Sequence, residues 1–201
     1  MPDRDEIVRS LTGAWTLFLD RADAMRFFNV SIDGFWRSFY AILLILPAYL
    51  IVVVAERARI FSEPATGVGF DGGAFFINKI LMIGLDWVTL PIILALVAGP
   101  LGVARTYVPY VVARNWAAVL ATTPFGIIEL FYLLGLIGSG VAGLIALVVL
   151  VIVIRYNYLI ARRALGADIG LAVGLIIADL AISLVVVGVA DGLVSYQPAI
   201  P

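Results

Sequence analysis

Residues 140–154 read GVAGLIALVVLVIVI, an apolar run without a charged side chain. A helix of about 20 such residues crosses the hydrocarbon core of a bilayer, which is about 30 Å thick. Working outward from this run, five segments of comparable length and character can be found. They lie approximately at residues 36–55, 74–98, 117–138, 140–161 and 169–190. We therefore expect an all-α fold, a polytopic membrane helix bundle of about five transmembrane helices.

The composition of the whole chain is typical of a protein solvated largely by lipid. Of its 201 residues, 63% are hydrophobic and 13% are charged, and the mean hydropathy is +1.11. A water-soluble domain needs more polar surface than this. The absence of Cys and His excludes disulfides, thiolate or imidazole metal sites and Ser-His triads. The net charge of −1 gives no basic field for nucleic acid. We expect no cofactor, no metal and no nucleic-acid partner.

The first 35 residues differ from the rest, because charged and apolar side chains alternate there at helical spacing. The apolar stripe consists of Ile7, Leu11, Ala14, Trp15 and Phe18. This pattern predicts an amphipathic interfacial helix at the membrane surface. Its apolar face either packs on the chain's own bundle, which we favour, or docks on lipid or a protein partner. The expected organisation is an amphipathic cytoplasmic arm (1–35), a five-span bundle (36–191) and an uncharged tail (192–201).

The distribution of basic residues predicts the orientation. With five spans and a cytoplasmic N-terminus, ten of the 13 basic residues fall on the inner side, and only Arg57, Arg59 and Lys79 fall outside. Cytoplasmic loops of membrane proteins carry such an excess. We therefore expect the N-terminus in the cytoplasm and the C-terminus outside. The expected location is a bacterial inner (plasma) membrane.

Aromatic and Arg side chains near the expected span ends are candidate interfacial anchors. Two of these positions share a short repeat, in which YVVAR at residues 110–114 recurs as YLIAR at residues 158–162. Either spans two and three are duplicated as four and five, or the same physics places the same residues at the same depth, which we favour. The candidate anchors are Trp15, Phe18, Trp36, Tyr110, Arg114, Tyr158 and Arg162.

Three carboxylates, Asp86, Glu129 and Asp179, lie in otherwise apolar segments, near the bilayer midplane by residue count. Each is followed within one helical turn by a hydroxyl, in the order Thr89, Tyr132 and Ser183. An ionisable group in a membrane needs a partner from another helix, a proton or water. Such a set can form a proton or cation relay, line a solute pathway, or act as protonated acids that join helices.

Small residues recur every fourth position into the last span, at Gly166, Gly170, Gly174 and Ala178. This spacing lets another helix backbone approach closely. We expect that helix to belong to the same chain, with a homo-oligomer face as the alternative.

Taken together, these features favour a non-enzymatic accessory or organising subunit of a larger membrane assembly. The alternative is a small oligomeric proton- or cation-linked carrier or channel that uses the midplane carboxylates. No local motif of an intramembrane aspartyl protease surrounds Asp86 or Asp179, so we do not expect an enzyme. The expected partners are the lipid bilayer and other membrane subunits or a second copy of the chain.

Overall fold

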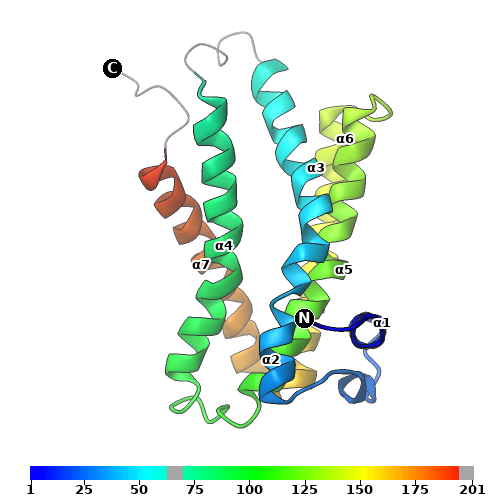
Figure 1. Ribbon diagram of the computed structural model, residues 1–201, viewed down its shortest axis with the longest axis vertical. Coiled ribbons are helices and arrows are strands. Elements are labelled where there is room, and N and C mark those ends of the chain that lie inside the picture. Colours follow the sequence, from blue (N-terminus) through cyan, green and yellow to red (C-terminus); the bar gives the residue numbers. More distant parts are fainter. Residues whose placement is uncertain (63–69, 195–201) are drawn as a thin grey trace.

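The computed structural model describes residues 1–62 and 70–194, and within these ranges the chain is helical with no strand (Figure 1). The elements follow one another as α1 (Arg4–Phe18), η1 (Ala24–Phe27), α2 (Ile32–Ser38), α3 (Ala41–Ser62), α4 (Gly72–Val97), α5 (Tyr107–Leu133), α6 (Ser139–Ile160), η2 (Ala161–Leu165) and α7 (Ile169–Leu193).

Five helical units are long and apolar enough to cross a membrane, which confirms the expected fold class. They are α2 with α3, α4, α5, α6 with η2, and α7. The chain is therefore a multi-pass membrane protein. The tail expected from residue 192 begins inside α7, and residues 195–201 lie outside the described part of the chain.

Polar side chains at the helix starts explain several of the observed boundaries. Asp3, Ser31, Asp71 and Asp168 each accept a hydrogen bond from a backbone N–H in the first turn of α1, α2, α4 and α7. These N–H groups have no partner within the helix, so a side-chain acceptor stabilises the start. At the other end, Gly166 has φ 71°, a left-handed conformation that glycine adopts without strain and that turns the chain toward α7.

The third span begins ten residues before the position expected from the sequence, at Tyr107 rather than residue 117. The expected span from residue 117 leaves out the polar residues Arg114 and Asn115. Instead, both find partners in other helices: Arg114 forms an ion pair with Asp179, and the Asn115 amide nitrogen donates a hydrogen bond to the Ser38 hydroxyl at 2.9 Å. Polar groups with such partners are tolerated inside a bundle.

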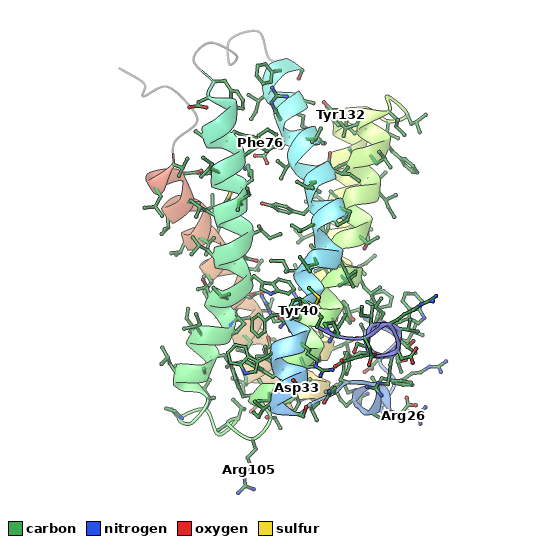
Figure 2. All side chains as sticks on the ribbon, viewed as in Figure 1. Arg26, Asp33, Tyr40, Phe76, Arg105 and Tyr132 are labelled. Carbon is green, nitrogen blue, oxygen red and sulfur yellow. The ribbon has the colours of Figure 1, made fainter. Side chains whose placement is uncertain are left out.

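The helices form two groups around a common axis (Figure 1). In the first group, α5 is central and packs against α3 and α6. In the second, α4 packs mainly on α7 and only sparsely on α5. The hydrophobic core is centred on the first half of α5, where Val111, Val112 and Ala113 are fully buried. Figure 2 places Arg26 and Arg105 at one end of the bundle and Tyr132 near the opposite end.

The amphipathic arm packs on the chain's own bundle, as we favoured from the sequence. Helix α1 lies across the bundle against α5 and α6 (Figure 1). Ala14 and Leu17 are fully buried, and the Tyr156 hydroxyl donates a 2.6 Å hydrogen bond to the carbonyl of Ala14. The Trp15 and Phe18 rings stack on each other. Most of the apolar face of α1 is thus at least partly buried against other parts of the chain.

The closest helix approach does not lie on the small-residue ridge of α7. Within the described residues, a Cβ built at Gly174 would meet nothing within 4 Å, and one at Gly170 would meet only Asp168 of the same helix start. A Cβ built at Gly126 of α5 would lie 2.7 Å from the Cβ of Ala48 in α3. Within the described residues, no neighbouring helix approaches Gly166, Gly170 or Gly174 closely, contrary to the packing within the chain that we favoured. Helices α4 and α7 leave an open groove beside Gly174 and Ala178.

Candidate functional site

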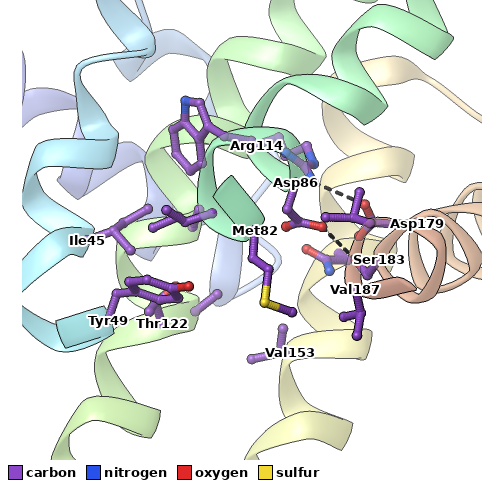
Figure 3. A pocket seen from close by; sticks show the side chains of 16 residues that line it. Ile45, Tyr49, Met82, Asp86, Arg114, Thr122, Val153, Asp179, Ser183 and Val187 are labelled. Atoms are coloured by element: carbon purple, nitrogen blue, oxygen red, sulfur yellow. Dashed lines mark hydrogen bonds and ion pairs between the residues drawn. The ribbon is translucent and has the colours of Figure 1, made fainter. Parts of the chain in front are cut away.

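A cavity of about 400 Å³ lies between the two helix groups (Figure 3). It is lined by side chains from all five membrane-spanning units, and most of them are apolar. The polar exceptions are Tyr49, Asp86, Arg114, Thr122, Asn157, Asp179 and Ser183. Small-molecule sites have this size and this mixture of apolar walls with a few polar groups.

On one wall of the cavity, Asp179 of α7 forms an ion pair with Arg114 of α5. The Arg114 Nη2 and Asp179 Oδ1 atoms are 3.0 Å apart, and the side chains are 14% and 24% exposed. Arg114 lies about two turns into α5, so the pair joins the two helix groups within the bundle. Charges that are partly withdrawn from water in this way must be paired. The pair therefore fixes α7 against α5.

Beside this pair lies Asp86 of α4. The Ser183 hydroxyl of α7 donates a hydrogen bond to Asp86 Oδ1 at 2.7 Å (Figure 3). Within residues 1–62 and 70–194, no Lys or Arg forms an ion pair with Asp86. Asp86 is half-buried and faces the cavity. A carboxylate in this setting can bind a cation or a proton.

The three carboxylates and three hydroxyls singled out in the sequence therefore come together only in part. The cavity brings Asp86, Asp179 and Ser183 together, as the sequence suggested. The Thr89 hydroxyl, however, donates to the carbonyl of Leu85 in its own helix at 2.6 Å and does not line the cavity. A serine or threonine hydroxyl in a helix can satisfy itself in this way without any neighbouring helix.

Glu129 and Tyr132 form a separate site. Glu129 lies four residues before the end of α5 and is therefore not near the middle of its helix, contrary to our expectation. Its Oε2 is 2.6 Å from Arg59 Nη2 of α3. The Arg59 guanidinium also lies 4.3 Å from the centre of the Tyr132 ring. These residues clamp α3 to α5 near one end of the bundle and take no part in the cavity.

Sequence reasoning missed Arg114 as a cavity residue, because we assigned it to the membrane interface. Two of the candidate anchors face other helices of the chain: Tyr110 is 6% exposed, and Arg114 turns inward to Asp179. The remaining candidate anchors vary in exposure. Trp15 and Trp36 are 53% and 64% exposed, and Arg162 is exposed while its guanidinium donates to the carbonyl of Ala167 at 2.7 Å. Phe18 and Tyr158 are half-buried.

A second set of polar contacts joins α3 and α4, and it includes the cavity residue Tyr49. The Tyr49 hydroxyl donates a 2.7 Å hydrogen bond to the carbonyl of Lys79, and Lys79 Nζ lies 2.6 Å from Glu56 Oε1. Tyr49 was not singled out from the sequence. A lone tyrosine or asparagine inside an apolar span, as at Tyr49 and Asn157, is the signal that would have found these cavity residues.

The described residues contain no group of three or more Asp, Glu, His or Cys side chains that could hold a metal ion. Neither the family models, nor the curated proteins, nor the solved structures to which the chain was compared gave a match.

Proposed function

We propose that this protein is a small, non-enzymatic membrane carrier or channel, linked to protons or cations, whose solute site is the cavity between the two helix groups. The proposal depends mainly on the position of Asp86 in this cavity. This carboxylate faces a cavity inside the bundle and is balanced there only by a hydroxyl in the described part of the chain. Burying an ionisable group in a membrane protein is costly, and such groups often mark ion and substrate pathways.

The arrangement of the helices also favours a carrier. The α4 and α7 pair packs on the α3, α5 and α6 group less extensively than the helices within each group pack on one another. Polar contacts such as Arg114 with Asp179 and Lys79 with Glu56 also join the two groups. Carriers expose a central site alternately by moving one group of helices against another. A less extensive interface of this kind is suited to two alternative arrangements.

The test is uptake into proteoliposomes that contain the purified chain. Four membrane-impermeant probes cover the main chemical classes: tetramethylammonium, glycine, mannitol and methanesulfonate. We expect protein-dependent uptake of at least one probe, and loss of that uptake in Asp86→Asn. Glu129→Gln is the matched control, because it also replaces a carboxylate by an amide but lies outside the cavity. Equal uptake by both variants, or no uptake by the parent protein, would argue against the proposal.

A second candidate, the accessory subunit, is favoured by the exposed groove between α4 and α7. This groove has a volume of about 240 Å³ and is lined by apolar residues together with Gly174 and Ala178. A small-residue surface without a partner helix in the described part of the chain suits a contact with another membrane subunit or a second copy. Purification in mild detergent, followed by identification of proteins that co-migrate at fixed stoichiometry, tests this candidate.

We also infer that the N-terminus is cytoplasmic, the C-terminus is outside and the membrane is a bacterial inner membrane. With Arg114 assigned to an ion pair inside the bundle, nine basic residues remain at the proposed inner side and three at the outer side. This excess still follows the positive-inside rule.

A further inference from the structure

The charges around the cavity do not cancel. The charged residues that line it are Asp86, Arg114 and Asp179, so its formal charge is −1. Arg114 is already paired with Asp179 at 3.0 Å. The remaining charge lies on Asp86, whose partner in the described part of the chain is the Ser183 hydroxyl at 2.7 Å. In a low-dielectric surrounding, one uncompensated charge attracts a solute of the opposite sign strongly.

The walls of the cavity determine what kind of cation fits. They are formed largely by aliphatic, thioether and aromatic side chains, including Met82, Trp87 and Tyr49. Ca²⁺ and Mg²⁺ need about six or more oxygen ligands, and the described residues provide no cluster of three candidate ligands for a metal ion. A volume of about 400 Å³ is also far larger than a bare ion requires. Apolar and aromatic walls instead stabilise alkyl groups and ammonium centres.

We propose that the cavity binds a small organic cation, an alkylated or primary ammonium compound, with its charged nitrogen at Asp86 and its alkyl groups against the apolar walls. This inference rests on the proposed function, in that it takes the cavity as the solute site. Figure 3 shows the geometry: Asp86, Asp179 and Ser183 lie on one side of the cavity, and Ile45, Tyr49 and Thr122 lie on the opposite side. A cation between them contacts the carboxylate at one side and the apolar and aromatic surface at the other.

The experiment uses the absence of native Cys. A single cysteine, Thr122→Cys, is placed in the cavity wall opposite Asp86, and Ser139→Cys provides an exposed control at the first residue of α6. Each purified variant is modified with two methanethiosulfonate reagents, one with a trimethylammonium group and one with a sulfonate group. The ratio of the two rates cancels the intrinsic reactivity of each thiol, and comparison with Ser139→Cys cancels the difference between the reagents.

We expect the normalised ratio at Thr122→Cys to favour the trimethylammonium reagent by about tenfold or more, since a tenfold ratio corresponds to only about 1.4 kcal/mol. Adding Asp86→Asn should abolish most of this preference, whereas Asp86→Glu, which keeps the charge, should retain it. Tetramethylammonium should slow modification of Thr122→Cys in the parent background, and mannitol should not.

A normalised ratio near one, a preference for the sulfonate reagent, or no modification by either reagent would overturn the inference. The result is separable from the transport assay. Uptake of mannitol or methanesulfonate without a cationic preference at Thr122→Cys would leave the carrier proposal standing and refute the solute class. A clear cationic preference that depends on Asp86, in a protein without uptake, would support the binding site and refute the carrier.

Discussion

Replacing Gly126 by Ala tests the packing that holds the larger helix group together. Gly126 is buried where α5 crosses α3, the most extensive helix contact in the described chain. A Cβ at this position would lie 2.7 Å from the Cβ and 2.8 Å from the Cα of Ala48. Carbon atoms in contact prefer about 3.5–4.0 Å. The two backbones must therefore separate by roughly 1 Å to accept a single methyl group.

The magnitude follows from a matched comparison with Gly174→Ala, where a Cβ would meet nothing within 4 Å among the described residues. Both substitutions raise helix propensity by a similar amount, so this gain cancels in the difference. The overpacking that remains at Gly126 costs about 1–3 kcal/mol. For a chain of this length, each kcal/mol corresponds to about 2–4 °C in the unfolding temperature.

The measurement is thermal unfolding in a mild detergent, followed by intrinsic tryptophan fluorescence. We expect Gly126→Ala to unfold several degrees below Gly174→Ala, and Gly174→Ala to unfold at or slightly above the parent temperature. If Gly126→Ala were as stable as Gly174→Ala, the close crossing of α3 and α5 would be incorrect. A large loss in Gly174→Ala alone would instead assign the tight contact to α7, as the small-residue spacing first suggested.

Three further predictions concern topology, the ion pair and the arm. Single cysteines at Thr12 and Ser139 should be labelled from opposite sides of the membrane by an impermeant maleimide; labelling from one side would contradict the proposed orientation. Arg114→Gln and Asp179→Asn should each lower the free energy of unfolding by about 3 kcal/mol, and the double variant by less than their sum, because a lone buried charge costs more than none; strictly additive losses would argue against the pair. Tyr156→Phe removes the hydroxyl that donates a hydrogen bond to the backbone of α1, so it should lower the free energy of unfolding by about 1–3 kcal/mol. A protease should then cleave α1 faster in limited proteolysis. Unchanged cleavage would show that α1 is held by apolar contacts alone.

The fold could be predicted from the sequence because a membrane allows few alternatives. A chain that crosses lipid must satisfy its backbone internally, so long apolar runs form helices. The starts expected at residues 74, 140 and 169 lie within two residues of the observed starts of α4, α6 and α7. The start of α5 was missed because Arg114 and Asn115 find their partners in α7 and α2, and a local reading of the sequence cannot supply partners from distant helices.

The site was harder to predict than the fold. Carboxylates stand out in apolar segments, which is why Asp86 and Asp179 were identified. Their neighbours depend on how each helix is rotated about its axis, and helices that are apolar on all sides carry little information about that rotation. For the same reason we expected the close helix approach at Gly174 of α7, whereas the structure has it at Gly126 of α5.

The pairing of α4 with α7 has a consequence for how the protein is made. Helix α4 ends at Val97, whereas α7 begins at Ile169, so two other spans must be synthesised before the main partner of α4 emerges. During that interval Asp86 has no Ser183 to donate a hydrogen bond to it, although it sits in a segment that is already hydrophobic enough to leave the translocon. Until α7 is inserted, α4 can contact only the other spans, such as α3 through Tyr49 and Lys79, and the cavity gains its fifth wall only when the last helix arrives.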